Sequence, residues 1–447
     1  MTRGDIGWLG IVRLGLAQTA LGAVVVLTTS TLNRVMVVEL ALPATVPGAL
    51  VALHYAVQML RPRLGYGSDV SGRATPWIVG GMTVLSLGGL LAAVATAWMA
   101  TQPVAGMVLV VAAFLLIGVG VGASGTSLLV LLAKQVDEER RAPAATIVWL
   151  MMIAGIAVTA GIAGSLLDPF SPARLVVVSG GVSLAAFLLA LFAVWGVERG
   201  GHAGSSATPA ARTPFLEALT QVWAEPEARR FTVFVFVSML AYSAQDLILE
   251  PFAGFVFGLT PGQSTSLSGV QHGGVLLGMI AVALAGTFGR GRLGSLRAWC
   301  IGGCVASAVM LAGLAASGLV GPGWPLRASV FGLGVANGAF AVAAIGLMMS
   351  LAGKGRKARE GVRMGMWGAA QAIAFGLGGF SGTVAADLAQ RLLGLPDIAY
   401  GLVFAAQAVL FLISAGLAAR VALPTAARGP SISLTAGDAY AAGLGGR

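Results

Sequence analysis

Hydrophobic residues dominate the chain in long stretches, and polar residues are largely confined to the segments between them. A helix that crosses a bilayer needs about 20 predominantly apolar residues, and twelve stretches approach or exceed that length. Their bounds are 14–40, 44–60, 76–100, 104–132, 144–166, 172–197, 230–257, 266–288, 297–320, 325–352, 364–390 and 397–421. The pattern predicts an all-α integral membrane protein with twelve transmembrane helices.

One long polar segment, from Glu198 to Arg230, separates the sixth stretch from the seventh. It contains the run Gly-Gly-His-Ala-Gly-Ser-Ser, whose small and polar residues are typical of a linker. Six helices, a linker and six helices indicate two related halves. We expect an N-terminal half over 1–197, a cytoplasmic linker over 198–230, a C-terminal half over 231–421 and a cytoplasmic tail over 422–447.

Composition agrees with this class, since 57% of the residues are hydrophobic and only 10% are charged. Soluble domains carry about 25% charged residues, so a soluble enzyme or a nucleic-acid-binding domain is excluded. The formal net charge is +10, but the basic residues do not cluster on a soluble face, so membrane lipid and not nucleic acid is the expected partner. Cys300 and Cys304 are too few for a disulfide framework or a four-cysteine zinc site, and we expect no metal centre.

A glycine-rich loop follows the second predicted helix and reads Gly-Tyr-Gly-Ser-Asp-Val-Ser-Gly-Arg over 65–73. Its Gly65, Asp69, Gly72 and Arg73 resemble the loop signature of the major facilitator superfamily at the same place in the chain. The resemblance implies a fold of two six-helix halves, with these residues forming a cytoplasmic latch. The equivalent loop of the second half, 289–294, keeps glycines and arginines but has no Asp.

Four charged residues lie within predicted helices one and seven, near their outer ends: Arg34, Glu39, Asp246 and Glu250. Such charges are costly in a bilayer, so they indicate either a functional cavity or a structural ion pair. Counting at 1.5 Å per residue places Arg34 and Glu250 at comparable depth. We therefore expect Arg34 to pair with Asp246 or Glu250 and to hold the outer side closed.

Several segments also resemble a more specific group, the PucC/LhaA proteins, which form the bacteriochlorophyll-delivery branch of that superfamily. The segments that carry this resemblance are 32–43, 48–58, 61–69, 75–78, 245–251 and 365–373. The resemblance implies a non-enzymatic factor for the assembly of light-harvesting complexes, located in the cytoplasmic or intracytoplasmic photosynthetic membrane of a bacterium. It would handle bacteriochlorophyll or chaperone antenna polypeptides, with these polypeptides and pigment-synthesis enzymes as partners.

Two histidines lie within predicted membrane helices, His54 in the second and His272 in the eighth. A neutral imidazole can supply an axial nitrogen to the magnesium of a chlorin, although a histidine hydrogen-bonded between helices is the alternative. Gly269, Gly273 and Gly274 would leave room beside His272, which makes it the better candidate; we expect His54 to bond a neighbouring helix. Further candidates for pigment contact are Trp367 and Gln371, with aromatic packing as the alternative for the tryptophan.

Two other functions are compatible with the sequence to different degrees. A secondary transporter of a small apolar or amphipathic solute would use the charges of helices one and seven in its cavity. A membrane prenyl transferase would need clustered carboxylates to hold magnesium diphosphate. Asp246 and Glu250 form only one isolated pair, so we expect no catalytic residues.

The distribution of basic residues predicts the orientation of the chain. All but four of the 27 Lys and Arg residues fall on the side that contains the linker and both termini, the exceptions being Arg34, Arg174, Arg327 and Arg391. Because positive residues accumulate on the cytoplasmic side, reporters fused within 198–230 and after Arg447 should both be cytoplasmic. An external location of either reporter would contradict the proposed arrangement of halves.

Overall fold

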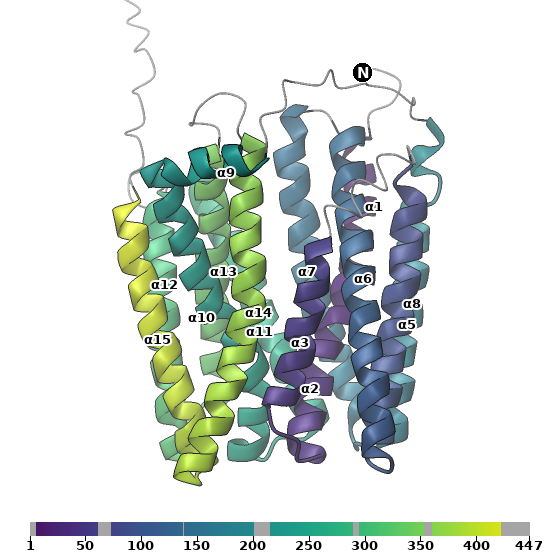
Figure 1. Ribbon diagram of the computed structural model, residues 1–447, viewed down its shortest axis with the longest axis vertical. Helices are drawn as coiled ribbons and strands as arrows, with labels where there is room; N and C mark the ends of the chain where they lie inside the picture. The colour runs from purple at the N-terminus through teal and green to yellow at the C-terminus, as the bar shows by residue number, and fades with distance from the viewer. Residues whose placement is uncertain are drawn as a thin grey trace, which may run out of the picture.

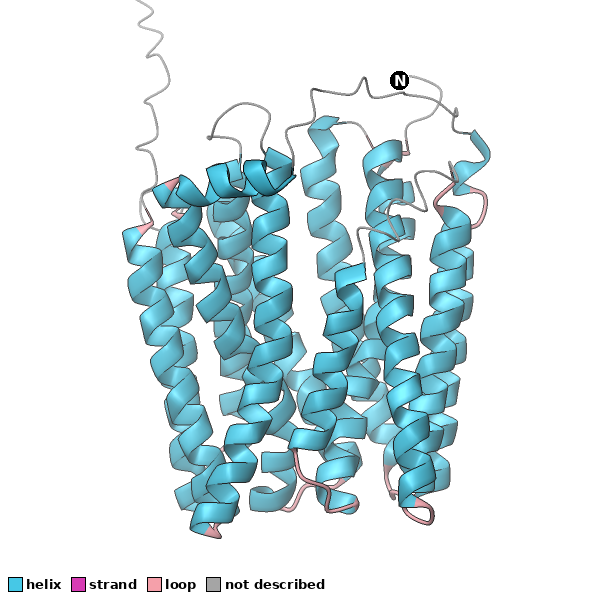
Figure 2. Ribbon diagram, viewed as in Figure 1, coloured by secondary structure: helices cyan, strands magenta, loops and turns pink. Residues whose placement is uncertain are grey.

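The computed structural model describes residues 6–60, 73–136, 138–200, 215–288, 295–352 and 360–421, and within these ranges all regular elements are helical. Figures 1 and 2 show one bundle of long, roughly aligned helices. Eleven helices in the described part are long and apolar enough to cross a membrane, and the shorter apolar helix Thr45–Leu60 accompanies them. The predicted all-α membrane architecture is confirmed.

The first helix runs from Trp8 to Glu39 without interruption, although its geometry changes along the way. It consists of α1 (Trp8–Val26), the π-helical η1 (Leu27–Thr31), α2 (Leu32–Arg34) and the π-helical η2 (Val35–Glu39). π-Helical turns are rare and frequently accompany functional sites. The rest of this half comprises α3 (Thr45–Val57), η3 (Gln58–Leu60), α5 (Thr75–Met99), α6 (Pro103–Gln135), α7 (Glu138–Leu167), α8 (Pro172–Val194) and η4 (Val197–Gly200).

The second half follows a similar sequence of long helices. Its elements are α10 (Pro226–Phe257), α11 (Pro261–Phe288), α12 (Leu296–Val320), η6 (Gly321–Gly323), α13 (Leu326–Ala352), α14 (Glu360–Leu393) and α15 (Pro396–Arg420). Before them comes α9 (Phe215–Ala224), within the segment predicted as a linker. It lies across the top of the bundle in Figure 1 and buries Val222 while half-exposing Trp223.

Helix α11 begins at Pro261, five residues before the predicted start at 266. The cause is a capping box, in which Thr260 and Gln263 satisfy each other's backbone N–H groups. The Thr260 hydroxyl accepts from Gln263 N, and Gln263 Oε1 accepts from Thr260 N, both at 3.1 Å. Proline at the first helical position completes a start signal that the hydropathy pattern does not register.

The buried apolar residues form two large clusters, one drawn from residues 11–194 with Leu247 and the other from residues 222–421. The first half meets the second mainly where α7 packs on α11 and where α3 packs on α14. Side chains that lie between the halves are therefore held by these two helix pairs.

Glycines let helices of the same half approach until their backbones touch. A Cβ added at Gly278 of α11 would overlap the carbonyl oxygen of Val335 in α13, and one added at Gly338 of α13 would overlap the carbonyl of Val275. Each glycine belongs to a pair four residues apart, with Gly274 or Gly334. Small residues at this spacing are typical of close-packed membrane helices.

Substitution at this contact provides a test of the packing. We expect Gly278→Val to lower the free energy of unfolding of the purified protein by about 1–3 kcal/mol, and with it the melting temperature, because overpacking forces the two backbones apart. Gly286→Val is the matched control, since it lies on the same helix with no atom within 4 Å of the added Cβ. Equal melting temperatures for the two variants would contradict the backbone contact.

Candidate functional site

Polar side chains from the first and second halves meet inside the bundle, toward the end opposite α9. Asn33 donates to the carbonyl of Leu247 at 2.7 Å, and the hydroxyls of Thr31 and Thr265 lie 2.9 Å apart. We define the inter-half seal as the set of residues Ser30, Thr31, Asn33, Leu247, Glu250, Thr265 and Ser268. All seven are buried, so their hydrogen bonds join the halves away from water.

Arg34 is 3% exposed and lies beside this seal. Its Nη1 is 2.7 Å from Glu39 Oε1, and its Nη2 donates to the carbonyl of Leu259 at 2.6 Å. The expected pairing of Arg34 with Asp246 or Glu250 was therefore wrong. The reason is the π-helical turn: an i to i+5 repeat stacks Glu39 on Arg34, as the backbone bond from Leu40 N to Val35 O shows.

Asp246 and Glu250 lie one turn apart on α10 and face neutral partners. The Glu250 carboxylate accepts from the hydroxyl of Ser30, which lies 2.9 Å from the hydroxyl of Ser268. The Asp246 carboxyl accepts a hydrogen bond from Gln271 of α11. Both acids thus connect α10 to its neighbours without an ion pair among the described residues.

His54 is buried in α3, and its Nε2 is 2.7 Å from Nε2 of Gln58, one turn further along the same helix. This bond lies within one helical segment, so it is not the bond to a neighbouring helix that the sequence predicted for His54. The carbonyl of His54 instead lies where Gly118 of α6 brings its backbone close. His54 therefore lies within the packed wall of the first half.

His272 has a different environment on α11. Its Nδ1 is 2.9 Å from the carbonyl oxygen of Ser268, which fixes the tautomer with the proton on Nδ1 and leaves the lone pair on Nε2. Ser268 and Met279, on the same helix face, are buried, whereas Leu277 and Leu284 are about half exposed. His272 thus lies on the inward face of its helix, away from the lipid-facing leucines.

The glycines around His272 do not all leave space. A Cβ at Gly269 would meet Gly161 of α7, and one at Gly274 would overlap the carbonyl of Phe331 in α13. The expectation that they open a slot was wrong, because both are used for helix contact. Only Gly273 has no atom within 4 Å of an added Cβ, and it directly follows His272.

Trp367 and Gln371, both on α14, differ in how deeply they are buried. Trp367 is 1% exposed, packs edge-on against Phe231 with ring centroids 5.0 Å apart, and points its indole N–H at Ala228 O. Its rings are enclosed by helix packing, which agrees with the packing alternative for this tryptophan. Gln371 is half-buried and remains a candidate.

An aromatic group that the sequence analysis did not single out connects the halves. Phe375 of α14 has its ring centroid 5.6 Å from that of Tyr55 in α3 and 5.9 Å from that of Tyr242 in α10. Tyr242 lies one turn before Asp246 on the same helix. The only sequence signal was the presence of two tyrosines inside predicted membrane helices.

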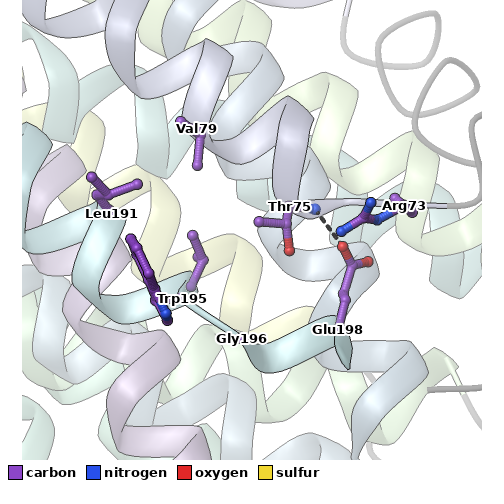
Figure 3. A pocket seen from close by; sticks show the side chains of 8 residues that line it. Arg73, Thr75, Val79, Leu191, Trp195, Gly196 and Glu198 are labelled. Atoms are coloured by element: carbon purple, nitrogen blue, oxygen red, sulfur yellow. Dashed lines mark hydrogen bonds between the residues drawn. The ribbon is translucent and has the colours of Figure 1, made fainter. Parts of the chain in front are cut away.

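The predicted latch is described only in part, since Gly65, Asp69 and Gly72 lie outside the described residues. Arg73 borders a pocket of about 190 Å³ at the start of α5, which Figure 3 shows with Trp195 and Glu198. Glu198 caps α5 by accepting from Ala74 N at 2.7 Å and Thr75 N at 2.9 Å.

The charge of Glu198 is stabilised at this position. Burial alone would raise the pKa of Glu198, but hydrogen bonds from Thr75 and Ala74 and the positive charge of Arg73 together hold it below its ordinary value. The carboxylate therefore stays ionised and complements the positive end of the α5 helix dipole. Arg73 thus has an acidic neighbour, Glu198, supplied by the segment that follows α8.

Solved structures of low sequence identity share this fold. A bacterial homologue of the human lysosomal transporter Spinster, in an inward-facing and unoccupied conformation, matches with a TM-score of 0.65 and 14% identity, covering 92% of this chain and 95% of that chain. The nucleoside transporter NupG matches with a TM-score of 0.67 and 14% identity, covering 92% and 99%. These likenesses confirm the predicted major facilitator fold and nothing beyond it.

Relatives in sequence match over most of the length of this chain. The chain is 56% identical to the "Bacteriochlorophyll synthase 44.5 kDa chain" of Rhodobacter capsulatus over 96% of its length and 99% of the relative. It is 29% identical to "Protein PucC" of the same organism, with 91% of each chain covered. The model of the "PUCC protein" family matches residues 31–426. The chain therefore belongs to the PucC family, in agreement with the resemblance seen in its sequence.

Proposed function

We propose that this protein is a non-enzymatic factor in the photosynthetic inner membrane that binds bacteriochlorophyll and assists assembly of light-harvesting antenna complexes. Membership of the PucC family supports the assembly role, and the name of the 56% identical relative supports a link to bacteriochlorophyll. The observation that carries the pigment contact is the geometry of His272.

A histidine that binds a metal usually donates its other ring N–H to a carbonyl or carboxylate, which orients the ring. His272 has this arrangement, since Nδ1 bonds Ser268 O and no described residue bonds Nε2. The next residue, Gly273, has open space where a side chain would stand. When bound, the magnesium of a chlorin would take the Nε2 lone pair of His272 as its axial ligand.

The aromatic group of Tyr55, Tyr242 and Phe375 offers a further surface for pigment between the halves. Flat aromatic side chains offer stacking surfaces to a flat macrocycle, and these three lie between the halves on α3, α10 and α14. Gln371 lies one turn before Phe375 on α14 and would add a polar contact. Antenna polypeptides would approach from the lipid side, where leucines such as Leu277 and Leu284 are exposed.

A second function must be tested because one close relative carries a synthase name. A prenyl transferase would have to bind magnesium diphosphate through acidic side chains. Asp246 and Glu250 bond to Gln271 and Ser30 inside the bundle, where they face neutral groups. This arrangement favours pigment binding over diphosphate chemistry.

Replacement of the proposed ligand tests the pigment site. We expect His272→Phe to lower the chlorin that co-purifies with folded protein by about tenfold or more, equivalent to about 1.4 kcal/mol of lost affinity. Phenylalanine keeps the bulk but removes the nitrogen. The measurement is chlorin absorbance per mole of monodisperse protein.

The matched control is His54→Phe, since His54 is a buried membrane histidine already bonded to Gln58. It should keep its pigment at the wild-type level. Equal pigment in the wild type, both single variants and the double variant would show that neither histidine is a ligand.

A direct assay separates assembly from synthesis. The purified protein, supplied with bacteriochlorophyllide, an isoprenoid diphosphate and Mg²⁺, should form no esterified pigment, because the acids of α10 are bonded within the helix bundle. Chromatography of the extracted pigments is the measurement. Turnover that is lost in Asp246→Asn would establish an enzyme and overturn the proposed role.

A further inference from the structure

Helix α10 carries two carboxyl groups whose surroundings contain few hydrogen-bond donors. Asp246 and Glu250 are four residues apart and therefore lie on one face of the helix. Glu250 is 2% exposed. Carboxyl groups so enclosed must be satisfied by hydrogen bonds, a cation or a proton.

The two carboxyl oxygens of Glu250 differ in their hydrogen bonds. Oε1 accepts from the Ser30 hydroxyl, whereas Oε2 is buried with no hydrogen-bond partner. Ser264 is close to this carboxyl, but its hydroxyl donates to the carbonyl of Pro261 at 3.1 Å. The neutral hydroxyls of Ser30 and Ser264 are therefore the side-chain donors beside these two buried oxygens, which is too little to stabilise an ionised carboxylate.

Asp246 repeats the same arrangement one turn earlier. Its carboxyl accepts from Gln271, while Oδ1 is buried and has no hydrogen-bond partner. The nearby cation does not supply the missing contact, because Arg34 directs one terminal nitrogen to Glu39 and the other to the carbonyl of Leu259.

Asp387 of α14 is a carboxyl group with a contrasting set of hydrogen-bond donors. Its oxygens accept from Ala44 N at 2.9 Å, from Thr45 N at 2.7 Å and from the hydroxyl of Thr45. Three donors at the start of α3, with the positive end of that helix dipole, stabilise a full negative charge. Asp246 and Glu250 have neither feature.

We propose that Asp246 and Glu250 form a proton-binding site, in which each carboxyl is protonated and neutral at neutral pH while the halves are in contact. Protonation removes the charge that burial disfavours, and a neutral carboxyl costs far less to bury with few hydrogen bonds than an ionised one does. Since Ser30 belongs to the first half and Glu250 to the second, the proton on Glu250 lies directly within the inter-half seal.

Several other titratable groups line the elements that pack on this part of α10. They are Arg34 on α2, Glu39 on η2, Tyr55 on α3, Tyr242 on α10, His272 on α11, Asp387 on α14 and Tyr400 on α15. Tyr400 packs on Phe252, and Asp387 accepts hydrogen bonds from Ala44 N and Thr45 N at the start of α3. Within this set Arg34 is the cation nearest to the seal, and it acts on Glu250 only through space, because its terminal nitrogens bond Glu39 and the carbonyl of Leu259.

Infrared spectroscopy of the full-length protein in lipid tests the proposal directly. Protein labelled with ¹³C at the side-chain carboxyl of Glu should show, at neutral pH, a carboxylic-acid C=O band that shifts with the label. This band should disappear in Glu250→Gln, and the band that shifts with ¹³C-labelled Asp should disappear in Asp246→Asn.

Asp387→Asn is the matched control, because it removes a membrane-helix carboxyl with three donors, and it should leave both bands unchanged. Absence of any label-shifted acid band from the wild-type protein at neutral pH would overturn the proposal, as would bands that survive in both variants. The wild-type measurement needs no substitution, so a variant that fails to fold does not remove the test. Because no pigment is required, the outcome is independent of the result for His272.

Discussion

The contact of the two halves depends on helix backbones that meet without side chains between them. Gly164 and Gly161 of α7 face Gly262 and Gly269 of α11, and a Cβ at any of Gly164, Gly262 or Gly269 would meet backbone atoms of the other helix. This approach brings α1 and α10 close enough for single hydrogen bonds to join them. The inter-half seal is therefore a consequence of glycine placement, and its polar residues only complete a contact that the backbones create.

The two helix pairs that join the halves use the same chemistry at their ends. Asp168, just after α7, accepts from the Thr260 hydroxyl at the start of α11 at 2.8 Å, and Asp387 accepts from Thr45 at the start of α3. The segments that receive them are similar, with Thr-Pro-Gly at 260–262 and Thr-Val-Pro-Gly at 45–48. An acid from each half thus accepts hydrogen bonds from the first turn, or the residue just before it, of a helix in the other half.

Features that depend on a single helix could be predicted from the sequence. Apolar length predicted the membrane helices, because each must cover its own backbone polar groups in lipid. Predictions failed where a second element or an unusual turn decides the geometry: α-helical spacing could not reveal the π-helical pairing of Arg34 with Glu39. Likewise the glycines near His272 could not be separated into packing glycines and the open Gly273 before α7 and α13 were in place.

Ser268 belongs to the inter-half seal and also contacts His272, the proposed pigment ligand. Its carbonyl accepts from His272, and its hydroxyl lies 2.9 Å from that of Ser30, which in turn bonds Glu250. A rotation of α11 that moves His272 would therefore also strain the contact between halves. In transporters of this fold the ligand site and the closing contacts must move together for alternating access. Because Ser268 contacts both His272 and Ser30, a pigment held at the proposed site would stabilise or loosen the contact between the halves.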